Sequence, residues 1–269
     1  MVKFLIGLSA GIFSGLVGIG GGVLLIPFMT GILKMQQHQA GGTSLVVIIC
    51  TGIVGAVTYA WRGSVDLGAS VLLASAAILT ARAGVYYAHT LPAWKLKRYF
   101  GAFMLLVTVL LFMKPYLFQI SSLAYGWIKI FALLSTGAIA GFLSGMLGIG
   151  GGVIMVPAMA LLTGLTQQTA QGSSLLAFVP IGLTGALAHW RLGNINTAIL
   201  PALIAGALIG SYLGASLANY LAESALRVIF SAVLLWTGVK YLRAPADKAG
   251  YEEEKHTIVL AKLDNERNN

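Results

Sequence analysis

Two glycine runs interrupt long hydrophobic stretches of the sequence, and both could present backbone groups to a ligand. The candidate glycines are Gly20, Gly21 and Gly22 in the first run and Gly150, Gly151 and Gly152 in the second. Pro27 and Pro157 follow the two runs, so each stretch is predicted to break there. A break frees N–H and C=O groups, and the helix that restarts after it directs its positive end toward an anion. The glycines are therefore candidate substrate ligands, although close helix packing could also explain them.

Amide and hydroxyl side chains open the hydrophobic stretch that follows each glycine run. These further candidates are Gln37, Thr43 and Ser44 after the first run and Gln167, Ser173 and Ser174 after the second. Such groups can take the place of water around the oxygen atoms of a ligand. Serine and threonine also cap helices and bond between helices, so a structural role remains an open alternative.

Arg82 lies near the middle of a hydrophobic stretch, where a charged side chain is costly and indicates function. We include it among the candidate substrate ligands. Acidic side chains show the opposite distribution, because Asp66 and Glu223 are the only acids within residues 1–243 and both lie at segment ends. Cation coordination and carboxylate proton relays are therefore disfavoured, and we expect no cofactor, no metal site and no catalytic residues.

The composition predicts a membrane protein. Hydrophobic residues make up 58% of the 269 residues and charged residues 9%, whereas about a quarter of an ordinary soluble domain is charged. Eight hydrophobic segments, long enough to cross a bilayer, lie near residues 4–33, 40–61, 67–89, 99–118, 127–163, 170–190, 197–220 and 224–242. The net charge of +9 comes mostly from bases beside these segments, which indicates membrane orientation rather than nucleic-acid binding.

The sequence repeats itself at a constant offset of 130 residues, as in Gly15 with Gly145 and Pro27 with Pro157. We therefore expect an all-α polytopic membrane protein built from two tandem four-segment repeats. The expected divisions are membrane repeat 1 over residues 1–120, membrane repeat 2 over 121–243 and a soluble, charged C-terminal tail over 244–269.

The two long, broken segments leave two topologies open. If all eight segments span the bilayer, both repeats have the same orientation. If the first and fifth segments are instead hairpins folded at their glycines, each repeat keeps three spans and the repeats are inverted. The hairpin version fits the positive-inside rule somewhat better, and both versions place the termini on the cytoplasmic side.

Two segments carry the same glycine pattern, Gly15-Leu-Val-Gly-Ile-Gly-Gly-Gly-Val-Leu-Leu-Ile-Pro27 and Gly145-Met-Leu-Gly-Ile-Gly-Gly-Gly-Val-Ile-Met-Val-Pro157. In these motifs the chain resembles the TauE/SafE family of sulfite exporter-like permeases, and the likeness extends over roughly residues 4–243. The pairs Thr43-Ser44 and Ser173-Ser174 also fit the family pattern. The resemblance implies a permease with eight spans for sulfite or for another sulfur-containing or organic anion, without identifying which one.

These features together predict a transporter of the cell membrane that exports a small anion by alternating access at the two glycine breaks. The expected cargo is sulfite, a sulfonate or a related anion, and the expected surroundings are a lipid bilayer without nucleic acid. Self-association into a homo-oligomer is left open. An anion channel is the main alternative. An intramembrane enzyme is less favoured, because the membrane segments hold no internal acid and no nucleophile paired with a base.

Overall fold

The computed structural model describes residues 1–88, 94, 98, 101, 102, 104–106, 108, 109 and 126–243, apart from the side chain of Gln37. All regular elements in this part of the chain are helices. They are α1 (Val2–Val17), α2 (Gly22–Gly31), α3 (Gln37–Ala60), α4 (Leu67–Ala88), α6 (Trp127–Leu147), α7 (Gly152–Leu162), α8 (Gln167–Arg191), α9 (Leu200–Tyr220) and α10 (Glu223–Leu242). The predicted all-α fold is therefore confirmed for the described residues. The predicted tail, residues 244–269, lies outside them.

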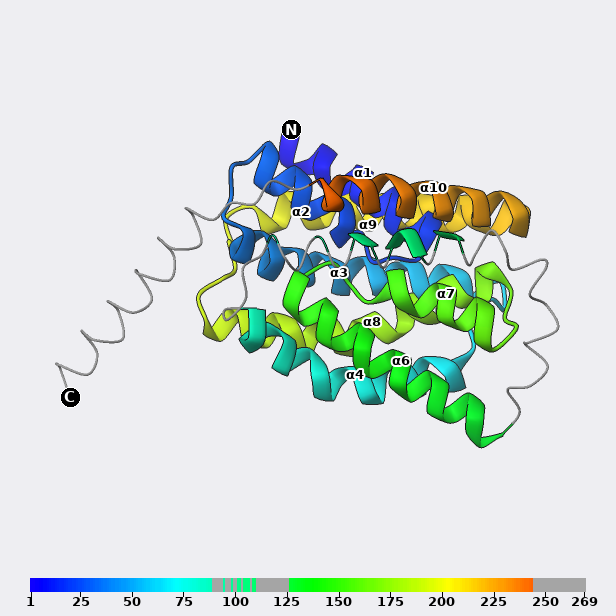
Figure 1. Cartoon of the computed structure of the whole chain (residues 1–269). Helices are drawn as coiled ribbons and strands as arrows, with labels where there is room; N and C mark the ends of the chain where they lie inside the picture. The colour runs from blue at the N-terminus through cyan, green and yellow to red at the C-terminus, as the bar shows by residue number, and fades with distance from the viewer. Residues whose placement is uncertain are drawn as a thin grey trace.

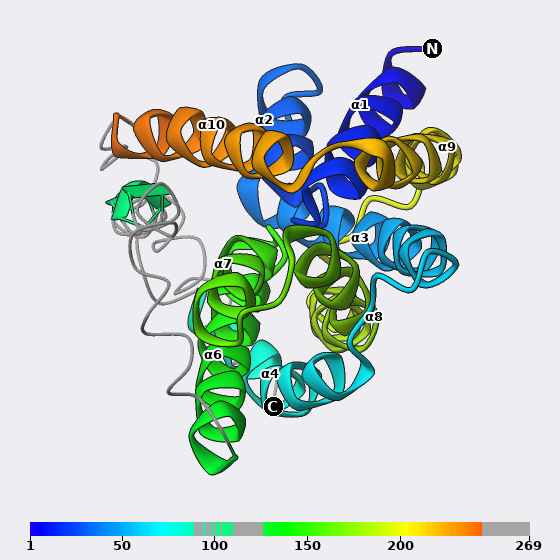
Figure 2. The same cartoon turned by 90° about the vertical axis from the view of Figure 1, so that its right-hand side faces the viewer.

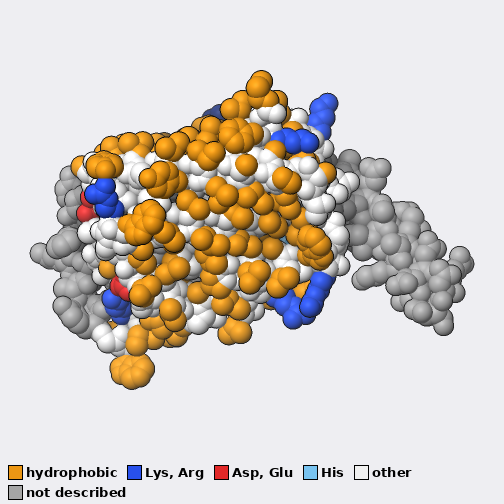
Figure 3. All heavy atoms as spheres, turned by 180° about the vertical axis from the view of Figure 1, so that it is seen from behind, with side chains coloured by type: hydrophobic (Ala, Val, Ile, Leu, Met, Phe, Trp, Pro, Cys, Tyr) orange, Lys and Arg blue, Asp and Glu red, His pale blue; other side chains and the backbone are white. Residues whose placement is uncertain are grey.

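Six of these helices, α3, α4, α6, α8, α9 and α10, are long and apolar enough to cross a membrane. Figure 3 shows hydrophobic side chains over the middle of one face, with Lys and Arg side chains gathered toward its two ends. This distribution is what a bilayer requires, since its hydrocarbon core excludes charge and its interfaces accept it. The chain is therefore a multi-pass membrane protein.

The difference between six long helices and eight predicted segments has two sources. The first predicted segment forms the two short helices α1 and α2, and the fifth forms the long helix α6 followed by the short α7. The fourth, near residues 99–118, lies largely outside the described residues. The other five predicted segments correspond to α3, α4, α8, α9 and α10.

Both breaks fall at the predicted glycine runs, and the chain turns back on itself there. Helix α1 ends at Val17 and is capped by Gly18, whose φ of 71° is a left-handed conformation suited to glycine, and α2 begins at Gly22. A Cβ atom on Gly21 would lie 3.0 Å from the carbonyl oxygen of Ala10, although a continuous helix would separate these residues by about 16 Å. The second break matches it, since a Cβ on Gly151 would lie 2.9 Å from Cβ of Ala140.

The helices form two groups around a central pair (Figures 1 and 2). Helices α3 and α8 pack against each other in the middle; α1, α2, α9 and α10 lie on one side, and α4, α6 and α7 lie on the other. Within these groups α1 packs along α9, and α4 packs along α6.

Glycines allow these two pairs to approach closely. On α1, glycines at four-residue spacing, Gly7, Gly11 and Gly15, place their Cα atoms directly against the carbonyl groups of α9, and Gly206, Gly210 and Gly214 of α9 do the same against α1. Gly137, Gly141 and Gly145 of α6 face α4 in the same way. Since lipid gives no hydrophobic drive to helix association, this close backbone packing supplies the dispersion contacts that hold each pair together.

Candidate functional site

The two glycine breaks touch each other at the centre of the bundle. A Cβ atom on Gly22 would lie 2.5 Å from the carbonyl oxygen of Ile149, and a Cβ on Gly152 would lie 2.5 Å from the carbonyl oxygen of Gly18. All residues of both breaks are buried. The two breaks are therefore in direct contact, and only glycine fits at either contact.

Backbone N–H groups at both breaks have no hydrogen-bond acceptor among the described residues. The last paired groups before the breaks are the N–H of Gly18 and Gly148, each bonded over 2.8 Å to the carbonyl oxygen of Ser14 or Ser144. No hydrogen bond is made by the N–H groups of the three residues that follow, which are Ile19, Gly20 and Gly21 in the first break and Ile149, Gly150 and Gly151 in the second. Since buried N–H groups are nearly always paired, this cluster of donors indicates a place where an anion or water binds.

Ser44 and Ser174 connect each central helix to the opposite break. The hydroxyl of Ser44, on α3, donates to the carbonyl oxygen of Gly148, and that of Ser174, on α8, donates to the carbonyl oxygen of Gly18 over 2.7 Å. Both serines also lie close to a carbonyl of their own helix, as serine hydroxyls in helices often do. Their hydroxyl hydrogens are thus engaged with the protein, and they position the breaks.

Thr43 and Ser173, each one residue before these serines, bond to loops instead of to the breaks. The hydroxyl of Thr43 accepts from the backbone N–H of Asn196 over 3.0 Å, and that of Ser173 accepts from the backbone N–H of Asp66 over 2.8 Å. Both acceptor contacts hold the loops that precede α9 and α4. These two predicted site residues therefore lie one residue from the break contacts, with their oxygens engaged with loops.

Replacing Ser174 by alanine is expected to lower the free energy of unfolding by about 1–3 kcal/mol, because the buried carbonyl of Gly18 loses its donor. Ser75→Ala on α4 is the matched control, since its exposed hydroxyl bonds only to the carbonyl of Leu72 in its own helix. Thermal and denaturant unfolding in detergent micelles would measure both variants. Equal stability of the two would show that the bond between α8 and the first break contributes nothing.

Two glutamines of α8 and a serine of α1 are fully buried and have polar atoms without a partner among the described residues. Gln167, Gln171 and Ser14 are each 0% exposed. Among the described residues, no hydrogen-bond partner meets either amide atom of Gln167, Nε2 of Gln171 or Oγ of Ser14. An unpaired buried polar group costs about 1–3 kcal/mol, so these atoms add to the indication of a ligand or bound water. Gln167 is a predicted site residue, whereas Gln171 and Ser14 were not predicted from the sequence.

Apolar side chains close the junction around the glycines. A Cβ on Gly20 would lie 3.0 Å from the ring of Phe178 and 3.2 Å from Ile48, and both of these side chains are 1% exposed. Ile48 and Phe178 occupy the same position in the two repeats, at the offset of 130 residues. Apolar side chains from both repeats therefore fill the space around the point where the two breaks touch.

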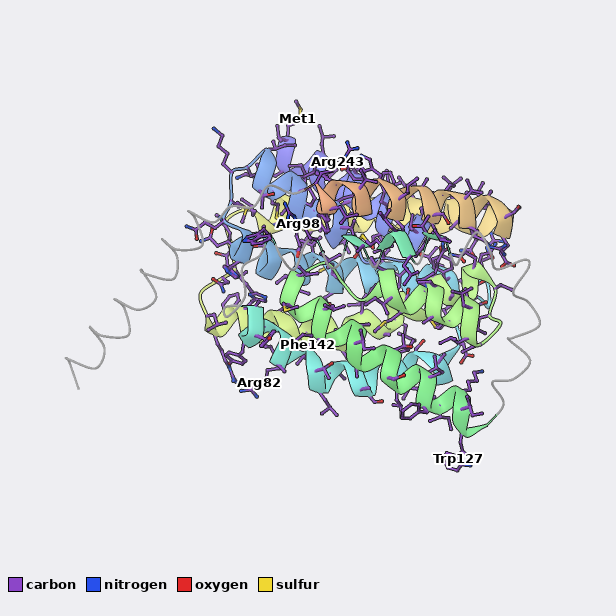
Figure 4. All side chains as sticks on the ribbon, viewed as in Figure 1. Met1, Arg82, Arg98, Trp127, Phe142 and Arg243 are labelled. Atoms are coloured by element: carbon purple, nitrogen blue, oxygen red, sulfur yellow. The ribbon has the colours of Figure 1, made fainter. Side chains whose placement is uncertain are left out.

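Arg82 is a predicted site residue that is not part of this cluster. Arg82 is exposed near the end of α4, with its guanidinium carbon 5.9 Å from the ring centre of Tyr86, and it points away from the bundle in Figure 4. The side chain of Gln37 lies outside the described residues. The structure therefore brings together the six glycines and the four hydroxyl residues, with Gln167 on the same central helix α8, and leaves Arg82 apart from them.

The fold and the junction define a class of protein: a multi-pass membrane protein in which two broken helical segments meet at the centre of the bundle, as in many transporters. The family model described as sulfite exporter TauE/SafE matches residues 3–241. The chain belongs to the TauE/SafE family, and its function is accordingly membrane transport.

Relatives from bacteria and archaea agree with this assignment. The chain is 28% identical to the probable membrane transporter protein YunE of Bacillus subtilis over 264 residues, which cover 90% of the chain and 97% of YunE. A probable membrane transporter protein of Xylella fastidiosa is 31% identical over 78% of the chain and 81% of its own length. One from Methanocaldococcus jannaschii is 25% identical over 86% of the chain and 90% of its own length. No solved structure matches the chain.

Proposed function

We propose that the protein exports a small anion, sulfite or a related sulfur-containing or organic anion, by alternating access at the junction of the two breaks. The observation that carries this proposal is the set of six backbone N–H groups, on buried residues where the breaks meet, that find no acceptor in the described part of the chain. The two short helices α2 and α7 begin at this junction, so their positive N-terminal ends add to a potential that favours an anion.

An inverted arrangement of the two repeats is part of the proposal. It is supported by the reversal of the chain at both breaks. It is also supported by where the two broken segments begin: Met1, before α1, and Trp127, the first residue of α6, lie at opposite ends of the bundle in Figure 4. In this arrangement, α1 with α2 and α6 with α7 are hairpins that enter from opposite sides and meet in the middle. Repeat 1 occupies residues 1–120 and repeat 2 residues 121–243, with both termini on the cytoplasmic side of the cell membrane.

Alternating access then requires the two breaks to separate toward one side of the membrane at a time. The closed junction, with glycine backbones in contact and Ile48 and Phe178 against them, is the state between the two openings. An anion that enters would replace its hydration shell with the free N–H groups of the breaks.

The membrane potential is sufficient to drive outward transport. With the inside negative, each negative charge that leaves gains about 2.3 kcal/mol per 100 mV, so export needs no coupled cation. The carboxylates of the two acids in residues 1–243 serve helix ends: Oδ1 of Asp66 accepts from the backbone N–H of Ala69 in the first turn of α4, and Glu223 pairs with Arg227 in α10. This placement favours uncoupled export over transport coupled to a cation.

Efflux from proteoliposomes tests the proposal. Vesicles loaded with sulfite, a small sulfonate or a small carboxylate are expected to release one of these anions with saturable kinetics. Release should be faster when an inside-negative potential drives the anion outward. Counterflow of labelled anion against unlabelled anion distinguishes this carrier from an anion channel, which shows none. Absence of flux for every anion, with and without a potential, would contradict the proposed function.

A further inference from the structure

Gln171 packs directly against the first break, where it could contact a bound ligand. Its side chain packs across Gly18, where a Cβ atom would lie 2.7 Å from Cβ of Gln171 and 2.9 Å from its Cγ. Gly18 caps α1 and directly precedes the three unpaired N–H groups of that break. The amide, held by Tyr59 near Gly15, therefore lies beside the last turn of α1, next to the start of this break.

The hydrogen bonds around Gln171 leave its nitrogen available. Its Oε1 lies 2.9 Å from the hydroxyl of Tyr59, and that hydroxyl also lies 2.9 Å from the carbonyl oxygen of Gly15. Tyr59 has one hydroxyl hydrogen, so it can serve one of these two acceptors at a time. Nε2 takes no part in this exchange and meets no acceptor among the described residues.

Gln167 continues this amide surface along α8. It lies four residues before Gln171, about 6 Å along the helix axis and on the same helix face. Both of its amide atoms lack a partner within the described part of the chain, whereas Gln168, between the two glutamines, bonds over 3.1 Å to the carbonyl oxygen of Leu221. The unpaired amides thus share one face of α8, and the paired one lies elsewhere.

The two breaks are not equivalent in this respect. At the repeat offset, Gly41 stands where Gln171 stands, and Gly41 packs against Gly148 as Gln171 packs against Gly18. Only the first break therefore has a glutamine amide at this position. A neutral amide donor together with backbone N–H groups suits an ionised oxyanion, because several of its oxygens can accept hydrogen bonds at once.

From these contacts, and resting on the proposed function, we infer that Gln171, with Gln167 one turn before it, binds the transported oxyanion at the first break and sets its affinity. The donor is Nε2 of Gln171, while its Oε1 stays with Tyr59. The ligand class is a small oxyanion such as sulfite or a sulfonate, in preference to a spherical halide.

Transport kinetics of Gln171→Met test this inference. Methionine has nearly the same shape without a donor, so KM for sulfite or a small sulfonate is expected to rise by about tenfold or more. Chloride flux should change less, which reduces the preference for the oxyanion. Gln168→Met is the matched control, because it removes a paired amide three residues earlier on the same helix; its KM should stay at the wild-type value even if its thermal stability falls.

Gln171→Glu gives an independent signature. A glutamate can still accept the hydrogen bond from Tyr59, but its second oxygen becomes a donor only when the carboxyl is protonated. Transport by this variant is therefore expected to recover as the pH is lowered, in contrast to the wild type. Wild-type flux combined with unchanged KM, selectivity and pH profile in both Gln171 variants would overturn the inference alone. Absence of flux in the wild type would instead overturn the proposed function.

Discussion

Gly22→Ala and Gly152→Ala are each expected to reduce anion flux by roughly tenfold to a hundredfold. Each added methyl would lie 2.5 Å from a backbone carbonyl oxygen of the opposite break, at Ile149 or Gly18. Backbone cannot move aside as a flexible side chain can, so the closed junction must separate, and overpacking of this kind costs about 1–3 kcal/mol. If that cost falls on the closed state through which every transport cycle passes, the rate drops by the corresponding factor. Initial efflux rates from proteoliposomes measure it.

Gly31→Ala is the control for this pair. Gly31 is the last residue of α2, and a Cβ atom there would meet no neighbouring atom within 4 Å. The same substitution in the same short helix should therefore leave flux at the wild-type level. Elution as a single species in detergent and a wild-type helical content would show that Gly22→Ala and Gly152→Ala remain folded. Wild-type flux from a folded Gly152→Ala protein would falsify the assignment of the junction as the transport site.

Gly206→Leu is expected to lower the free energy of unfolding by about 3 kcal/mol or more and to reduce the yield of folded protein sharply. Gly206 is buried in the contact between α9 and α1, where a Cβ would overlap the backbone carbonyl of Phe4. A leucine there forces the two helices apart and removes the close packing along the whole pair. Denaturant unfolding in micelles and the yield of folded protein from membranes measure the effect.

Ala205→Leu supplies the comparison for the packing prediction. Ala205 precedes Gly206 on α9 but is exposed, on a surface that faces lipid in a membrane. A larger apolar side chain is compatible with that surface, so stability should change by less than about 0.5 kcal/mol. If both leucine variants were equally stable, close contact between α1 and α9 would not be what holds this pair together.

The positions of the breaks could be predicted from sequence because glycine runs have few uses at membrane depth. A helix there can leave its hydrogen-bonding pattern only where protein or water satisfies the freed groups. A glycine run at the same position of both repeats therefore indicates a helix break in each repeat. That argument located Gly20–Gly22 and Gly150–Gly152 correctly as breaks. It could not establish that Gly22 touches Ile149, since contact between segments far apart in sequence depends on how α3 and α8 pack.

The misplacement of Arg82 shows that the position of a residue along a hydrophobic segment does not reveal which side of the helix it occupies. Its place in an apolar segment predicted cost and hence function, but depth does not say which side of the helix a residue occupies. Ala81 and Val85 are 0% exposed on the face of α4 that packs in the bundle, and Arg82 lies on the outer face with Tyr86. An arginine on such a face can extend toward the membrane interface, so its cost is smaller than the segment position suggested.

Gln171 was missed for a different reason. The comparison of the two repeats selected residues that agree between them, such as Ser44 with Ser174, and a glutamine opposite Gly41 does not agree. Its significance depends on full burial and on an amide nitrogen without a partner, which no pattern of residue types reveals. Differences between the repeats were the signal that could have found it.

The serine bonds cross between the two halves of the molecule, and this has a mechanical consequence. Helix α3 carries Ser44, which holds the end of α6, and α8 carries Ser174, which holds the end of α1. A sliding movement of α3 against α8 therefore pulls on both hairpins in the same stroke. In the proposed alternating-access cycle, two breaks connected in this way would move together, so that opening toward one compartment would accompany closing toward the other and limit leak across the membrane.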